Sequence, residues 1–104
     1  MKVQFNTDKT IHGDEKSSAY FIGLIEEGLK RFSSHITRIE IHLSDENGKK
    51  DGLKDIRCLM EARLEGRQPV AITSQENTEE QAISSAVEKM KDSLESILGK
   101  LQNH

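Results

Sequence analysis

The sequence contains few residues of several types that are abundant in other classes of protein. It contains no tryptophan, one proline and one cysteine among 104 residues, and aromatic residues make up only 4% of the chain. Cys58 cannot form a disulfide within the chain, so the framework of a small secreted domain is excluded and a reducing cytoplasm is expected. No apolar run is long enough to cross a membrane, and the N-terminus MKVQFNTDK lacks the apolar core of a secretory signal.

Basic segments are missing as well. The 15 Lys and Arg residues are outnumbered by 18 Asp and Glu, which gives a net charge of -3, and neither half of the chain is basic. Binding to nucleic acid without sequence preference depends largely on Lys and Arg that neutralise phosphates, so this charge balance counts against strong binding of this kind. Any contact with RNA must come from a local cluster of cations.

Residue patterns typical of catalysis are also absent from the sequence. It has no glycine-rich phosphate loop, no pair of cysteines and no His-x-x-x-His spacing. The four histidines are scattered over two predicted loops, a strand and the tail: His12, His35, His42 and His104. The acidic pairs Glu26-Glu27 and Glu79-Glu80 do not converge, because neighbouring positions on a helix point in different directions. We therefore expect no enzyme activity, no metal, no cofactor and no small-molecule substrate.

What the chain does have is clear periodicity. Alternation of apolar and polar residues predicts four strands, over about residues 2–7, 36–44, 56–66 and 69–74. In the third strand, Cys58 lies on the apolar side and is expected to be a buried thiol. The polar segment between the second and third strands contains the turn pairs Asn47-Gly48 and Asp51-Gly52 and predicts a hairpin loop.

Apolar residues at steps of three and four predict two helices. The first runs from an N-cap at Asp14 to about Phe32, and Gly23 and Gly28 within it indicate either a close approach to the sheet or a frayed, exposed helix. The second runs to about Gln102 from a capping box formed by Thr78 and Gln81. Its apolar stripe suits one layer that covers the sheet.

These elements predict a single α+β domain over residues 1–104, in the order β-α-β-β-β-α. A right-handed crossover through the first helix makes the first two strands parallel, and the last three strands form an antiparallel meander. The result is a four-stranded mixed sheet with both helices packed on one face. The other face of the sheet is left open to solvent or to a partner.

Charge placement distinguishes this open face. Five cations outnumber three glutamates there: Lys2, Arg38, Arg57, Arg63 and Arg67 against Glu40, Glu61 and Glu65. The last helix has the opposite balance, with three lysines against five acidic residues. Arginine is suited to planar recognition of phosphate, so the open face is a candidate RNA-binding surface. Alternatively, its charges pair within the sheet, with Glu40 and Glu61 opposite Arg63 and Arg38.

Three stretches of the sequence resemble one known family. They are RFSSHITRIEIHLSDENG, CLMEARLEGRQPVAIT and TEEQAISSAVEKMKDSLESILGKL. Together with the β-α-β-β-β-α order they resemble the ribosome hibernation-promoting factor and RaiA family, over almost the whole chain from Lys2 to about Leu101. Arg31-Phe32 at the end of the first helix and Ala82-Ile83 at the start of the last helix match the family.

The resemblance implies a non-enzymatic stress protein. Such proteins bind the small ribosomal subunit in the channel used by mRNA and tRNA, and they hold ribosomes inactive when growth slows. Family members also share a likeness to double-stranded-RNA-binding domains. Long members carry an added C-terminal domain for ribosome dimerisation, and this chain is expected to be a short form without it, with its own oligomeric state left open.

The resemblance adds helix residues to the RNA-binding candidates. Lys89 and Lys100 fall on basic positions of the family's last helix, and Arg31 and Arg38 lie near the end of the first helix and the start of the next strand. The candidate set is therefore Lys2, Arg31, Arg38, Arg57, Arg63, Arg67, Lys89 and Lys100. Other positions of the last helix are not basic where short family members have Lys or Arg. The alternative is a divergent protein-interaction module of the same fold that has lost RNA binding.

Overall fold

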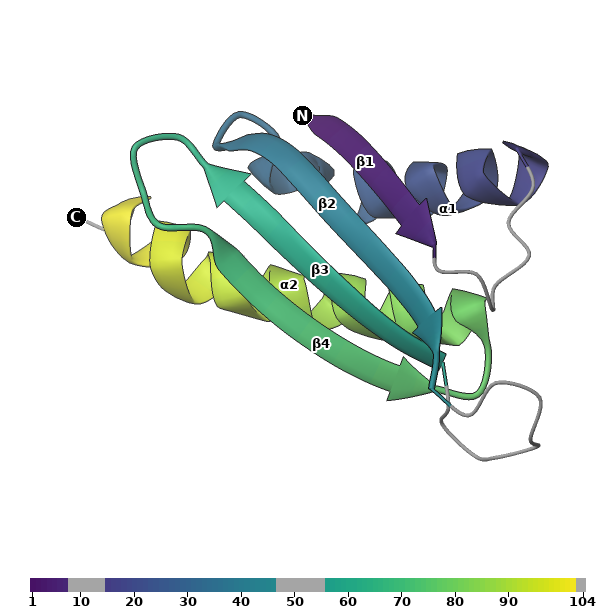
Figure 1. The fold of residues 1–104 in the computed structure, drawn as a ribbon. Helices are drawn as coiled ribbons and strands as arrows, with labels where there is room; N and C mark the ends of the chain where they lie inside the picture. The colour runs from purple at the N-terminus through teal and green to yellow at the C-terminus, as the bar shows by residue number, and fades with distance from the viewer. Residues whose placement is uncertain (8–14, 47–55, 103–104) are drawn as a thin grey trace.

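The computed structural model describes residues 1–7, 15–46 and 56–102 (Figure 1). The elements are β1 (Lys2–Thr7), α1 (Glu15–Gly28), the 3₁₀ helix η1 (Lys30–Phe32), β2 (Ile36–Asp45), β3 (Ile56–Leu64), β4 (Val70–Glu76) and α2 (Glu79–Gln102). This order confirms the predicted α+β class. The expected helix cap at Asp14 and the turn pairs Asn47-Gly48 and Asp51-Gly52 lie outside the described residues.

The four strands form one mixed sheet in the order β1-β2-β3-β4. β1 is parallel to β2, while β2 with β3 and β3 with β4 are antiparallel, as predicted. Both helices lie behind the sheet in the view of Figure 1, with α1 near β1 and α2 across β3 and β4. One face of the sheet is covered by this helix layer, and the other face is open.

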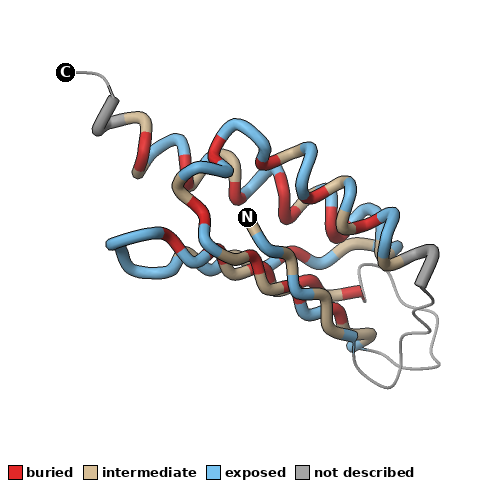
Figure 2. Tube along the Cα trace, turned by 90° about the horizontal axis from the view of Figure 1, so that it is seen from above, coloured by how far each residue is buried: buried red, intermediate tan, exposed pale blue. Residues whose placement is uncertain are grey.

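The core lies between the sheet and the helix layer. The inward side chains of β2 and β3 and the apolar stripe of α2 are buried, as their periodicity predicts, and Figure 2 shows buried positions recurring along the strands and the helices. The largest fully buried side chains are Ile25, Leu29, Ile39, Ile41, Leu43, Met60, Ile83, Met90, Leu94 and Cys58. The capping of α2 is also confirmed, because the Gln81 backbone N–H donates to Thr78 Oγ1 at 3.1 Å.

The first helix ends earlier than its periodicity predicts. The α-helix stops at Gly28, and the chain continues to Phe32 through a turn and the 3₁₀ helix η1, in which the Phe32 N–H donates to the Leu29 carbonyl at 2.9 Å. Residues three apart share one side of a 3₁₀ turn, so this tighter winding keeps both Leu29 and Phe32 in the core.

The two glycines of α1 differ from each other. A Cβ on Gly28 would lie 2.5 Å from Cγ1 of Val87, so Gly28 allows a close approach to α2 rather than to the sheet. A Cβ on Gly23 would meet no heavy atom within 4 Å. Gly28 therefore makes a helix–helix contact in place of the expected contact with the sheet, whereas Gly23 is exposed, as the alternative predicted.

The edge strand β4 begins one residue later than predicted. It starts at Val70 instead of Pro69, because proline has no backbone N–H to give to a sheet. β3 ends at Leu64, two residues before the predicted end, and Gly66 in the following turn has a φ of 71° that suits glycine.

Candidate binding surface

Three cations lie side by side across the open face of the sheet. The strand register places Lys2 of β1 opposite Arg38 of β2, and Arg38 opposite Arg63 of β3. We call these three residues the cation row. Like charges directly opposite each other in a sheet are destabilising, so this arrangement requires negative charge nearby.

The negative charge lies in the next row along the strands. Glu40 of β2 stands directly opposite Glu61 of β3, and Gln4 of β1 completes this row. The expectation that Glu40 and Glu61 stand opposite Arg63 and Arg38 is therefore wrong in register, although the expected ion pair between Glu40 and Arg63 is confirmed. Alternation determines which side chains face outward, but partners depend on the register, which shifts between Ile36 and Arg38.

The ion pairs of the open face run between these two rows. Arg63 Nε lies 3.3 Å from Glu40 Oε2 and 3.2 Å from Glu61 Oε1, and Arg38 Nη2 lies 3.7 Å from Glu40 Oε1. Partial burial raises the pKa of Glu40, but the charges of Arg38 and Arg63 and the hydrogen bond that Arg63 donates outweigh it and hold this pKa below its usual value. The four side chains form a network without net charge.

The cation row is not fully compensated by this network. Lys2 has no ion pair within the part of the chain that the structure describes, so the cation row as a whole keeps one excess positive charge. Arg38 Nε is shielded from solvent and has no hydrogen-bond partner among the described residues. A buried N–H without an acceptor is costly, so Arg38 is not fully satisfied by its contact with Glu40.

The other two arginines that the sequence analysis assigned to this face lie near opposite ends of β3. Arg57, near the start of the strand, has its Nε 3.8 Å from Glu46 Oε1. Arg67 lies in the turn between β3 and β4, where it lines an open hollow of about 660 Å³ together with Gly66, Gln68 and Ile97. Arg67 is exposed and makes no ion pair with any other described residue.

The helix candidates are engaged within the molecule. Arg31 of η1 pairs with Glu95 of α2, with Nη2 and Oε1 2.6 Å apart, and its guanidinium stacks on Phe32. Lys89 Nζ donates to the backbone carbonyl of Thr73 in β4 at 2.9 Å. Lys100 belongs to α2, but its side chain lies outside the described part of the structure.

A groove between α1 and α2 was not found from the sequence. It has a volume of about 280 Å³ and is lined by Leu24, Glu27, Gly28, Ser84, Val87 and Glu88. At one end of the helix pair the Tyr20 hydroxyl donates to Glu80 Oε1 at 2.6 Å. Gly28 was the only sequence signal of this groove, since a glycine inside an apolar helix pattern can mark a close helix contact.

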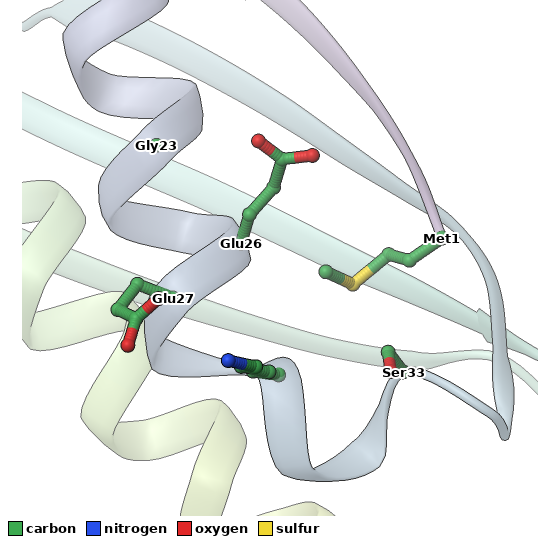
Figure 3. A pocket seen from close by; sticks show the side chains of 6 residues that line it. Met1, Gly23, Glu26, Glu27 and Ser33 are labelled. Carbon is green, nitrogen blue, oxygen red and sulfur yellow. The ribbon is translucent and has the colours of Figure 1, made fainter.

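No catalytic arrangement emerges from the described residues. A second pocket, of about 380 Å³, lies beside α1 and contains Glu26, Glu27 and Lys30, but Figure 3 shows the two glutamates leaving the helix on different sides. Within the described ranges, no group of three or more His, Cys, Asp or Glu could hold a metal ion. Nor is any helix in these ranges long and apolar enough to cross a membrane.

The fold defines a small α+β domain with one open, charged sheet face. Residues 4–102 match the family described as sigma 54 modulation protein / S30EA ribosomal protein, and the chain belongs to this family. This result confirms the resemblance seen in the sequence.

Two solved structures have the same fold at low sequence identity. The N-terminal domain of Protein Y from Thermus thermophilus is 16% identical with a TM-score of 0.68, over 93% of this chain and 99% of that one. A ribosomal subunit interface protein from Coxiella burnetii is 15% identical with a TM-score of 0.73, over 95% of this chain and 99% of that one. A comparison with curated proteins found no match.

Proposed function

We propose that this protein associates with the small ribosomal subunit in the cytoplasm and modulates translation by binding rather than by catalysis. The family description includes a ribosomal protein, and the similar protein from Coxiella burnetii is named for the ribosomal subunit interface. In this proposal the cation row and Arg67 contact phosphates of ribosomal RNA. No cofactor or small-molecule substrate takes part.

The cation row is the observation that carries the proposal. Lys2, Arg38 and Arg63 stand side by side across three strands, and the shielded Nε of Arg38 lacks an acceptor among the described residues. The Arg38 side chain is still 37% exposed, so a phosphate group above it would accept hydrogen bonds from its guanidinium and reduce the repulsion between the three cations.

The eight candidate residues then fall into two groups. Lys2 and Arg67 are exposed and unpaired within the described structure, so they can bind phosphate without breaking an internal contact. Arg31, Arg57 and Lys89 must first give up a glutamate or a backbone carbonyl. Arg38 and Arg63 are also paired with glutamates, but they share a row with the unpaired Lys2. We therefore assign the primary contacts to the cation row and Arg67, and secondary contacts to the other four candidates, Arg31, Arg57, Lys89 and Lys100.

Co-sedimentation with purified ribosomes at low and moderate salt tests this assignment. The double variant Lys2→Gln/Arg67→Gln should lose ribosome binding and reduce the slope of log affinity against log salt by about one to two. Lys30→Gln/Lys91→Gln changes the net charge equally and serves as the control, because neither lysine lies on the open face. Equal loss in both variants would contradict the assignment and leave only general electrostatic attraction.

A variant with gained affinity makes the test independent of unfolding. Glu40→Gln/Glu61→Gln removes the two carboxylates that hold Arg38 and Arg63, so binding should become tighter and more dependent on salt. Circular dichroism checks that the fold is kept. Unchanged or weaker ribosome binding in this variant would show that the open face is not the contact surface.

A second candidate function is a protein-interaction module that has lost RNA binding. It is favoured by the acidic helix layer, where residues 79–99 of α2 carry five acidic residues against two lysines. If every open-face variant binds ribosomes like the unmodified protein, the contact lies on another surface. If the unmodified protein stays at the top of the gradient even at low salt, ribosome association itself is wrong.

A further inference from the structure

The groove between α1 and α2 is open and apolar at its base. Leu24 and Gly28 of α1 and Val87 of α2 supply its apolar surface, and Ser84 adds a second small side chain to its wall. Gly28 has no side chain, and Val87 of α2 occupies the space that its Cβ would take. The two helices leave the space beside this contact unfilled, and this space is the groove. A side chain of moderate size on another molecule would fit a space of about 280 Å³.

An exposed aromatic residue extends this apolar surface. Tyr20 lies one helical turn before Leu24 on α1, and 53% of it is exposed, which makes it the exposed large hydrophobic side chain of the described structure. Its hydroxyl is held by Glu80 of α2, so the ring has a fixed position between the two helices. Tyrosine held in this way loses little entropy on binding and is among the residues that anchor protein interfaces.

The rim of the groove is acidic. Glu27 of α1 and Glu88 of α2 line opposite walls, and Glu80 stands beside Tyr20. Lys91 lies 3.4 Å from Glu88 and is the one nearby lysine on α2 within the described residues, because Lys89 is turned toward the edge of β4. The side chain of Glu88 is 71% exposed and keeps most of its surface free for a second partner.

We propose that this groove binds an amphipathic, Lys/Arg-rich helix of a protein partner. A third helix packs into the groove between two helices by placing its apolar ridge along the gap. The apolar residues of the partner would meet Tyr20, Leu24 and Val87, while its cations would face Glu27 and Glu88. A second copy of this chain would bring another acidic helix layer to the groove, so charge complementarity selects a basic partner. This interaction goes beyond the proposed contact with ribosomal RNA and uses the opposite face of the molecule.

Titration of the ¹⁵N-labelled protein with a synthetic 14-residue Lys/Leu peptide of helical periodicity tests this proposal by NMR. The peptide should shift the amide signals of residues 20–28 and 80–91 more than those of the open sheet face. A peptide with the same lysines but Gln in place of Leu should bind at least about tenfold more weakly, because it cannot fill the apolar base. A peptide with Glu in place of Lys should not bind.

Variants of the protein complete the test. Glu27→Lys/Glu88→Lys should weaken binding of the Lys/Leu peptide at least about tenfold, by replacing attraction with repulsion at both walls. Glu46→Lys/Glu65→Lys gives the same change in net charge away from the groove, and its affinity should change less than about twofold. Ser84→Arg should block the groove sterically and abolish the shifts.

Several outcomes would overturn the proposal. They are shifts spread evenly over the acidic surface, equal binding of the Leu and Gln peptides, and equal loss of affinity in the groove variant and its charge-matched control. Short single-stranded RNA that shifts the same groove residues would also contradict it. The groove variants should still sediment with ribosomes if the cation row binds RNA, so the two proposals fail separately.

Discussion

Cys58 lies in the middle of β3 on its inward side, where none of its surface is exposed. Burial raises the pKa of its thiol to about 12, so the reactive thiolate is almost absent at neutral pH. We expect a thiol reagent to label the native protein at pH 8 at least about 1000-fold more slowly than the urea-unfolded protein, since labelling requires unfolding. Labelling of the native protein at the unfolded rate would contradict the burial of this residue.

Gly28 and Gly23 offer a matched pair of substitutions on α1. Gly28→Ala places a Cβ 2.5 Å from Cγ1 of Val87, and we expect it to lower the free energy of unfolding by about 1–3 kcal/mol in chemical denaturation. Gly23→Ala meets no neighbour within 4 Å and should instead add about 0.5–1 kcal/mol through helix propensity. Stabilisation by both substitutions would show that the helices are not in close contact at Gly28.

A hydrogen bond from α2 stabilises the edge strand β4. Lys89 reaches from the helix to the Thr73 carbonyl, and a lysine beside an edge strand opposes pairing with another chain. Lys89→Ala should lower the free energy of unfolding by about 0.5–1 kcal/mol and increase self-association, measured by denaturation and by sedimentation velocity. Lys91→Ala, which loses only a 3.4 Å contact with Glu88, is the control and should change neither quantity by a comparable amount.

The helices and strands could be predicted because apolar residues recur in each of them at a regular spacing. Alternation across Ile39, Ile41 and Leu43 identified β2, and the cap at Thr78 located the start of α2. Element ends were less predictable: the 3₁₀ turn before Phe32 depends on core packing that no local pattern records. The residues that stand opposite Arg38 and Glu40 on β3 were also predicted wrongly. Alternation along β2 determines which face of the sheet a side chain is on, but it does not determine the register of β2 against β3.

At the scale of the whole molecule, the two faces differ in charge. The open sheet face carries the cation row, whereas the helix layer carries the acidic rim of the groove. This difference in charge could be predicted from the sequence, because the alternation of apolar and polar residues assigns each charged residue to a strand face or to a helix. The groove itself required the packing of α1 on α2, which brings Leu24 and Val87 together from distant parts of the sequence.

The free energy of unfolding of the whole molecule should decrease at both acidic and alkaline pH. The pKa of Glu40 is lowered in the folded state, so its contribution is present above its usual pKa of 4.5 and is lost as the pH falls below that value. The pKa of Cys58 is raised from 9.0 to about 12 by burial, and that of Tyr20 is raised above 10.0 by its hydrogen bond to Glu80. Both contributions are present below the usual pKa values and are lost as the pH rises, between about pH 9 and 12 for Cys58.

Urea denaturation from pH 3 to pH 11 of the unmodified protein, Glu40→Gln and Cys58→Ala separates these contributions. Glu40→Gln should be less stable than the unmodified protein at pH 7, and the difference should shrink below pH 4.5 because the unmodified carboxyl then becomes neutral as well. Cys58→Ala should lose stability at every pH through its smaller side chain, but its stability should fall less steeply above pH 9. A constant difference for Glu40→Gln down to pH 3 would mean that its contacts with Arg38 and Arg63 do not depend on charge, and the open face would then lack the ion-pair network described for it.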